Sequence, residues 1–221
     1  MLSQNRIING VRSKGKTIRY WGESCVAAVR TLLFRNNMEL WTKVAHAGKP
    51  GWDGRNAIIA GFIPAGSSVL DIGCGPQTLR QHLPAGCRYQ PCDMIKSTPD
   101  VILCDVNSGL YPQVNERFDY VVCSGVFEYV RNEAEFLSRI PTYAPNVILS
   151  YNPLSPKCHR KTKLERLAGS WVNHHTREEL EKTFDAAGLT WKALHTSDLD
   201  EVIYSLQGPA GKVKPAKTNG N

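Results

Sequence analysis

Three aspartates in the middle of the chain each lie in, or directly follow, a short apolar stretch. They are Asp71, Asp93 and Asp105. Short apolar stretches are typical of strands buried in a parallel sheet, and ligands of such sheets bind at the carboxyl ends of the strands. We therefore expect the three carboxylates to meet at one edge of a sheet, where they can accept hydrogen bonds from a ligand. Capping of the strand ends, with no ligand involved, is the alternative.

A glycine turn accompanies the first aspartate, in the sequence Val69-Leu70-Asp71-Ile72-Gly73-Cys74-Gly75. Glycine allows a tight backbone turn and leaves space beside it for a ligand. Asp93 follows Gly75 by 18 residues, which is the spacing expected of a carboxylate that accepts both hydroxyls of a ribose. Asp105 can accept from an adenine amino group while the N–H of Val106 donates to the ring. These spacings predict a ligand that contains adenosine.

The residue at position 78 separates two kinds of adenosine ligand. A dinucleotide fingerprint needs a third glycine there, and this chain has Thr78. A dinucleotide also places its pyrophosphate at the turn, whereas Asp71 puts a carboxylate there, which suits a ligand that carries an ammonium group. S-adenosylmethionine therefore fits the turn better than NAD does.

Taken together, these motifs resemble the class I S-adenosylmethionine-dependent methyltransferases. The resemblance covers roughly residues 67–207 and rests on several separate segments. These are Val69 to Gly75, Asp93, Cys104-Asp105-Val106, the stretch from Phe118 to Tyr129, and a closing strand pair after Ala187-Gly188-Leu189. That family ends its sheet with an antiparallel seventh strand.

The resemblance implies a role for each residue of the motifs. The glycine turn with its aspartate holds the methionine end of the cofactor, the second aspartate holds the ribose, and the third holds the adenine. The residues concerned are Asp71, Gly73, Cys74 and Gly75 for the methionine end, Asp93 and the adjacent Met94 for the ribose, Asp105 and Val106 for the adenine, and the carbonyl of Cys123 for the ammonium group.

Arg55 and two departures from the family pattern complete the predicted site. Arg55, in Trp52-Asp53-Gly54-Arg55, can pair with the cofactor carboxylate, although a surface arginine beside a turn is an equal alternative. Gln77 stands where many members of the family have a third glycine, and it narrows the turn. Tyr129 stands where many have histidine, which removes a residue that is sometimes near the substrate.

The candidate catalytic residues are His174 and His175, with His159 in reserve. Methyl transfer from a sulfonium is an in-line displacement, so a base is needed only if the acceptor loses a proton. A neutral imidazole can take that proton near pH 7, and the pair precedes a predicted helix in a segment able to fold over the strand ends. Adjacent histidines before a helix also serve simply as polar N-terminal residues.

The acceptor is less well defined than the cofactor. No Asn-Pro-Pro-Tyr motif follows the fourth strand, which disfavours amino-group methylation of DNA bases. The stretch Gly169 to His175 resembles small methyltransferases associated with bacterial polysaccharide synthesis. We expect methylation of an oxygen, or less readily a nitrogen, on a small molecule or glycan precursor. The alternatives are a nucleic-acid-associated methyltransferase and a catalytically silent scaffold that binds the cofactor.

Composition sets wider limits on the protein. The chain has 221 residues, 42% hydrophobic, with a formal net charge of +7. The basic surplus lies in residues 1–66 and 156–221, on either side of the central segment that carries the aspartates, and either serves solubility or attracts an anionic partner. The seven cysteines include no C-x-x-C pair, so we expect reduced thiols and no metal site. No apolar run suggests a membrane span or a signal peptide, which predicts a cytoplasmic protein.

Apolar periodicity predicts an α/β fold with a doubly wound, mostly parallel, seven-stranded sheet and an N-terminal helical cap. The expected domains are a basic arm with cap helices over residues 1–66, the cofactor-binding domain over 67–207 and a disordered tail over 208–221. The expected strands are residues 67–72, 88–92, 101–104, 118–123, 146–150, 189–195 and 201–207, and the expected helices are 23–38, 57–62, 79–83, 133–140 and a capped helix from Thr176 to Ala187.

Overall fold

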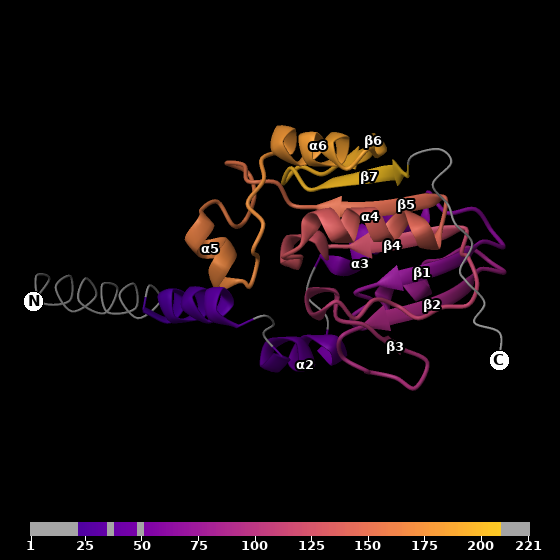
Figure 1. Cartoon of the computed structure of the whole chain (residues 1–221), viewed down its shortest axis with the longest axis horizontal. Coiled ribbons are helices and arrows are strands. Elements are labelled where there is room, and N and C mark those ends of the chain that lie inside the picture. The colour runs from indigo at the N-terminus through magenta and orange to yellow at the C-terminus, as the bar shows by residue number, and fades with distance from the viewer. Residues whose placement is uncertain (1–21, 35–37, 48–50, 209–221) are drawn as a thin grey trace, which may run out of the picture.

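The computed structural model describes residues 22–34, 38–47 and 51–208. A seven-stranded sheet in the order β3-β2-β1-β4-β5-β7-β6 forms its centre (Figure 1). β7 pairs antiparallel with both of its neighbours, and the other pairings are parallel. The strands are β1 Ser68–Ile72, β2 Arg88–Asp93, β3 Ile102–Leu103, β4 Tyr120–Ser124, β5 Asn146–Tyr151, β6 Thr190–Thr196 and β7 Val202–Gln207.

Helices cover both faces of this sheet, which confirms the doubly wound architecture. In Figure 1, α4 crosses one face and α3 lies behind the other. The helices are residues 22–33, α2 Met38–Ala47, α3 Trp52–Ala60, α4 Glu133–Tyr143, α5 Lys163–Ala168 and α6 Arg177–Ala186, and short 3₁₀ helices are η1 Thr78–Gln81, η2 Val106–Ser108 and η3 Phe127–Tyr129.

Alternating side chains of the central strands form two apolar cores. Leu70 of β1 and Val121 of β4 point to the face covered by α4 and α6, while Val69 and Val122 point to the face covered by α3. Successive side chains of a strand point to opposite faces, so strands apolar at every position are buried on both sides. The apolar strands predicted from the sequence therefore lie at the centre of the sheet.

The N-terminal helices differ most from the prediction. The first helix ends at residue 33, and a separate helix, α2, begins at Met38. α3 begins at Trp52, ahead of the helix predicted over residues 57–62, and Gly51 precedes it in the left-handed conformation (φ 90°). The predicted arm over residues 1–21 and the tail after residue 208 lie outside the described residues.

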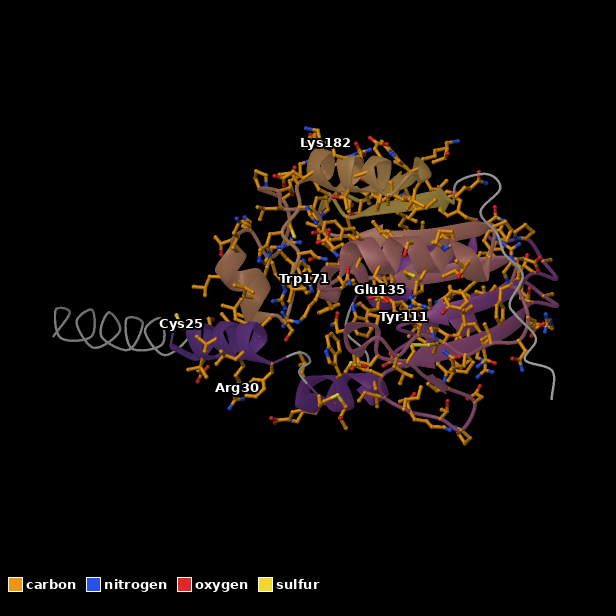
Figure 2. The ribbon with its side chains drawn as sticks, viewed as in Figure 1. Cys25, Arg30, Tyr111, Glu135, Trp171 and Lys182 are labelled. Atoms are coloured by element: carbon orange, nitrogen blue, oxygen red, sulfur yellow. A yellow bond between two sulfur atoms is a disulfide. The ribbon has the colours of Figure 1, made fainter. Side chains whose placement is uncertain are left out.

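The segment between β5 and α6 is anchored by two large side chains. Arg166 of α5 is fully buried and donates hydrogen bonds to the carbonyl oxygens of Asn152 (2.8 Å) and Asn173 (3.1 Å). Trp171 lies between α5 and the sheet (Figure 2), and its indole N–H donates to the hydroxyl of Tyr129 at 2.8 Å. Neither α5 nor this anchoring is predicted from the sequence, whereas the capping box at Thr176 is confirmed.

The prediction that all cysteines are reduced is wrong for two of them. Cys92 of β2 and Cys104, just after β3, form a disulfide in the structure, and both are buried. β2 and β3 are neighbours with Cys92 opposite Ile102, which brings the two Cα atoms to 6.0 Å. Only the strand register places these residues together, so their spacing along the chain gives no sign of it.

Two features are absent from the described residues. None of their helices is both long enough and apolar enough to cross a membrane. Nor do their His, Cys, Asp and Glu side chains gather in groups of three or more suited to a metal ion.

Candidate functional site

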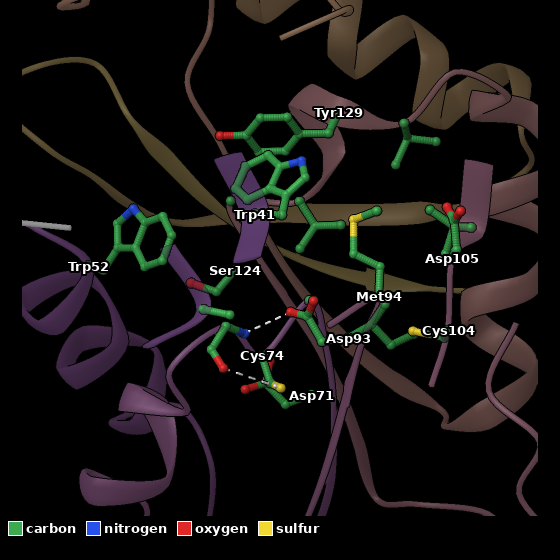
Figure 3. A pocket seen from close by; sticks show the side chains of 18 of the residues that line it. Trp41, Trp52, Asp71, Cys74, Asp93, Met94, Cys104, Asp105, Ser124 and Tyr129 are labelled. Carbon is green, nitrogen blue, oxygen red and sulfur yellow. Dashed lines mark hydrogen bonds between the residues drawn. The ribbon is translucent and has the colours of Figure 1, made fainter. Parts of the chain in front are cut away.

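A pocket opens at the carboxyl ends of β1, β2 and β4, where the sequence predicts ligand binding. We call it the strand-end pocket. Figure 3 shows the rings of Trp41 and Trp52 facing the carboxylates of Asp71 and Asp93 across it. Nine of the ten residues predicted to bind the cofactor line this pocket: Arg55, Asp71, Gly73, Cys74, Gly75, Asp93, Met94, Asp105 and Val106.

The tenth residue, Cys123, does not line the pocket. β4 extends through Ser124, one residue beyond the predicted strand, so Cys123 lies fully buried inside the sheet opposite Leu149. Ser124 and Gly125 line the pocket in its place. The sequence therefore predicts the correct strand end but places it one residue too early.

The turn after β1 requires glycine at its first position. Gly73 has φ 76°, and a Cβ atom there would lie 2.4 Å from Cγ2 of Val126. Its N–H donates to the carbonyl of Cys92 at 2.7 Å, which ties the turn to β2. The turn thus brings bare backbone against the pocket.

Asp93 braces this turn from the end of β2. Its Oδ2 accepts from the N–H of Gly75 at 2.8 Å, and its Oδ1 accepts from the N–H of Ile95 at 3.0 Å. Burial raises the pKa of Asp93, while these backbone N–H groups act against the rise. The carboxylate is held in a fixed orientation and retains lone pairs for further donors.

Asp71 is a buried carboxylate, and one of its two oxygens lacks a hydrogen-bond donor among the described residues. Its Oδ2 accepts from the hydroxyl of Tyr89 at 2.6 Å, and no described residue donates to its Oδ1. Burial raises the pKa of Asp71 to about 7, the nearby charge of Asp93 adds to the rise, and the Tyr89 hydrogen bond and Arg55 oppose it. A buried acceptor without a donor is costly, so the pocket suits a ligand that carries a donor or a positive charge.

Asp105 has a local role in the fold as well as a place in the pocket. Its Oδ1 accepts from the N–H of Asn107 at 3.1 Å and caps the short helix η2. Strand-end capping therefore holds for this aspartate, and it does not prevent ligand contact because Asp105 and Val106 both line the pocket.

Arg55 spans the strand-end pocket and a second cavity beside it. Its Nε donates to Oγ of Ser124 and its Nη1 to Oε1 of Glu201, both at 2.8 Å. Gly125 makes room for this guanidinium, because a Cβ there would lie 2.8 Å from both terminal nitrogens. Arg55 is thus fixed between α3, β4 and the β6–β7 turn.

The second cavity, which we call the side cavity, has a volume of about 470 Å³. It shares Trp52, Arg55, Gly125 and Tyr129 with the strand-end pocket. Its other lining residues come from four parts of the chain: Gly51 and Ile58 near α3, Glu128 in η3, Asn152, His159, Arg160 and Trp171 from the segment after β5, and His195, Ser197, Asp198, Leu199, Glu201 and Ile203 from the β6–β7 region.

Two buried polar atoms in the side cavity lack a partner among the described residues: Oε2 of Glu128 and Nε of Arg160. Oε1 of Glu128 accepts two hydrogen bonds from Asn152, from the backbone N–H at 3.0 Å and from Nδ2 at 2.9 Å. Burial raises the pKa of Glu128, against the hydrogen bonds from Asn152. Both residues line the cavity, and these two atoms still lack hydrogen-bond partners within the described part of the chain.

The predicted catalytic histidines lie elsewhere. His174 and His175 line neither the strand-end pocket nor the side cavity, whereas the reserve candidate His159 lines the side cavity. His175 Nε2 lies 2.9 Å from the Glu133 carboxylate, at the start of α4. The pKa of His174 is lowered, chiefly by burial.

Several residues at the two cavities were not predicted from the sequence. Tyr89 lies on β2 directly opposite Val69, and its partnership with Asp71 follows from the strand register. Glu201 meets Arg55 across 146 residues of chain. Glu128 had a visible signal, since an acid just after an apolar strand is the feature that identified the three aspartates.

The strand order, the glycine turn and the carboxylates at the ends of β1 and β2 define a class I S-adenosylmethionine-dependent methyltransferase. The methyltransferase domain family matches residues 52–194, and the chain belongs to this family. The predicted class, fold and cofactor are confirmed.

Individual relatives share less with the chain. Over 108 residues it is 30% identical to the bifunctional methionine biosynthesis protein MetXA/MetW of Rhodopirellula baltica, which covers 41% of this chain and 17% of that protein. The structure of CalO1, a methyltransferase in calicheamicin biosynthesis, matches with a TM-score of 0.53 and 19% identity over 72% of this chain and 54% of CalO1. The chain therefore corresponds to only part of both proteins.

A third relative is similar over more of its length. The 1,6-didemethyltoxoflavin-N1-methyltransferase of Burkholderia thailandensis, crystallised with 1,6-didemethyltoxoflavin and S-adenosylhomocysteine, matches with a TM-score of 0.54 and 18% identity. The match covers 77% of this chain and 82% of that one. At these identities the likeness to solved structures shows a common fold.

Proposed function

We propose that this protein transfers the methyl group of S-adenosylmethionine to an oxygen atom of a small molecule or glycan precursor bound in the side cavity. The observation that carries the proposal is the side cavity itself, which adjoins the strand-end pocket through Trp52, Arg55, Gly125 and Tyr129. Its volume of about 470 Å³ lies in the range of small-molecule sites. The Burkholderia enzyme, named for a small-molecule acceptor, gives this size argument further support.

The residues of the strand-end pocket fit the cofactor. Asp93 is held in place to accept from the ribose hydroxyls, and Asp105 with Val106 would hold the adenine. Oδ1 of Asp71, which no described residue satisfies, would attract the ammonium group of the methionine end. S-adenosylmethionine, when bound, supplies a methyl group on a sulfonium. A nucleophile can attack the methyl carbon, and the neutral thioether then leaves.

The side cavity favours an acceptor that carries a hydroxyl group. A hydroxyl can donate to Oε2 of Glu128 or accept from Nε–H of Arg160, the two buried atoms of the lining that lack a partner among the described residues. Glu128 would take the hydroxyl proton as the oxygen forms its bond to the methyl carbon and the carbon–sulfur bond breaks, with its electron pair going to sulfur. The raised pKa of Glu128 brings it closer to that of an effective base. Proton transfer by His174 or His175 remains a prediction from the sequence alone.

Product analysis tests this proposal. The full chain is incubated with methyl-labelled S-adenosylmethionine and a protein-free, nucleic-acid-free extract of bacterial metabolites, and labelled products are identified by mass spectrometry. We expect a labelled methyl ether. Label that enters only added RNA or DNA would instead support the nucleic-acid alternative, and cofactor binding without labelling of either acceptor source would support the silent scaffold.

A further inference from the structure

The helix over residues 22–33 presents its large apolar side chains to solvent. Val26, Val29, Leu32 and Leu33 are 58%, 52%, 62% and 73% exposed, and Phe34 just after the helix is 60% exposed. The side facing the rest of the protein carries small residues instead, among them the buried Ala28 and Thr31. This is the reverse of the usual arrangement, in which the apolar stripe of a surface helix faces the core.

Polar contacts fix the helix in this orientation. Oγ1 of Thr31 donates to the carbonyl of Leu167 in α5 at 2.8 Å. Arg131, just before α4, donates to the carbonyl oxygens of Thr31 and Phe34, the latter at 2.8 Å. Rolling the helix to bury its apolar side would break these bonds. The apolar side is therefore available to a partner.

The position and charge of the helix indicate what that partner is. Figure 1 shows the helix at one end of the molecule, beside α5 and away from the sheet, and Figure 2 shows Arg30 on its side away from α5. Residues 1–21 of the sequence contain Arg6, Arg12, Lys14, Lys16 and Arg19 and no acidic residue. An apolar helix face next to a concentration of positive charge is the combination that anionic lipid surfaces bind.

Other partners satisfy only one of the two features. A nucleic acid would neutralise the arginines and lysines but would leave Leu32, Leu33 and Phe34 in water. A second copy of the chain would cover the apolar residues but carries the same net positive charge of +7, which opposes association. We propose that this helix face docks the protein on a membrane surface that contains anionic lipid. The proposal does not depend on the identity of the methyl acceptor.

Vesicle sedimentation tests the proposal on the full chain. The vesicles contain phosphatidylcholine alone, or phosphatidylcholine and phosphatidylglycerol in equal parts. We expect binding to the anionic vesicles that weakens with added salt. Replacing Leu32→Glu and Leu33→Glu together should weaken this binding by roughly tenfold or more, because both side chains then resist burial in lipid.

A matched variant, Leu103→Glu, controls for added negative charge. Leu103 is 52% exposed on β3 and lines neither cavity, so this change should leave vesicle binding nearly intact. Binding of S-adenosylhomocysteine by every variant shows that each is folded. Equal sedimentation with both kinds of vesicle, or full binding by the Leu32 and Leu33 double variant, would overturn the proposal. If the protein binds no vesicles, the proposal would also be overturned by dimers that the double variant abolishes, or by binding of duplex DNA.

Discussion

The hydroxyl of Tyr89 donates a hydrogen bond of 2.6 Å to Oδ2 of Asp71 from the neighbouring strand. The bond occupies one carboxylate oxygen and leaves Oδ1 without a described donor at the edge of the strand-end pocket. Because burial raises the pKa of Asp71 to about 7, the charge of this carboxylate changes as the pH passes through neutrality. We therefore expect this pair to link cofactor affinity to pH.

We predict that the affinity for S-adenosylmethionine rises as the pH rises toward 7. Asp71 is neutral below its pKa of about 7 and negative above it, and the negative form attracts the cofactor's ammonium group. If only that form binds well, affinity should change by up to about tenfold per pH unit below the pKa. Calorimetric titrations across this range measure the change.

Methylthioadenosine is the matched control ligand for this titration, since it lacks the amino acid end of the cofactor. Its affinity should be nearly independent of pH. Asp71→Asn should flatten the profile for S-adenosylmethionine, and Tyr89→Phe should move the rise to higher pH because the lost hydrogen bond had lowered the pKa. The same pH dependence for both ligands would show that Asp71 does not face the ammonium group.

We predict that Asp93→Ala weakens cofactor binding while the fold survives. Hydrogen bonds to a charged group are worth about 1.5–3 kcal/mol, so the dissociation constant should rise roughly 10- to 150-fold. Part of this loss reflects the turn, because Asp93 also accepts from the N–H of Gly75. Calorimetry with S-adenosylhomocysteine measures the effect, and Asp100→Ala, at an exposed aspartate outside the pocket, is the control. An unchanged dissociation constant would mean that the ribose is held elsewhere.

How far the sequence predicts the site depends on how far apart in the chain the interacting residues lie. Asp71 and Asp93 were predictable because the ends of adjacent parallel strands must meet at one sheet edge. The partners of Arg55 were not, because Glu201 reaches it only through the β6–β7 turn, far along the chain. The burial of Arg166 is equally unpredictable from the sequence, since it depends on carbonyl groups that the fold brings to the guanidinium.

The first helix shows a second reason why sequence patterns fail. Its apolar residues recur at helical spacing, which predicts a helix there, and the apolar side of a surface helix usually faces the core. In the structure the helix packs through Ala28 and Thr31 instead. Periodicity identifies the helix, whereas its orientation depends on the polar contacts that Arg131 and α5 offer.

We predict that Glu128→Gln lowers the rate of methyl transfer to a hydroxyl by about 10²- to 10⁴-fold, the range for loss of a general base. Glutamine retains an oxygen to accept from Asn152, so the cavity should keep its shape and the affinity for S-adenosylhomocysteine should not change. The rate is measured with the acceptor identified by product analysis. Glu133→Gln, which alters the carboxylate beside His175 and lies outside both cavities, is the matched control.

The same assay on histidine variants separates the two candidates for the base. His174→Ala and His175→Ala should turn over at the parent rate, because neither residue lines the strand-end pocket or the side cavity. His159→Ala should change the Michaelis constant for the acceptor, since His159 lines the side cavity. A large loss of rate in the His174 or His175 variant, with Glu128→Gln fully active, would assign the base to a histidine instead.

We predict that Gly169→Ala raises the Michaelis constant for the acceptor by displacing Arg160. A Cβ atom at Gly169 would lie 1.5 Å from Nη1 of Arg160, so the guanidinium must move. The backbone of Gly169, with φ −91°, accepts alanine without strain, and the displaced atoms are the end of a flexible side chain. The melting temperature and the affinity for S-adenosylhomocysteine should therefore change little. Gly54→Ala in α3, where nothing lies within 4 Å of the added atom, is the control. An unchanged Michaelis constant in Gly169→Ala would show that Arg160 does not contact the acceptor.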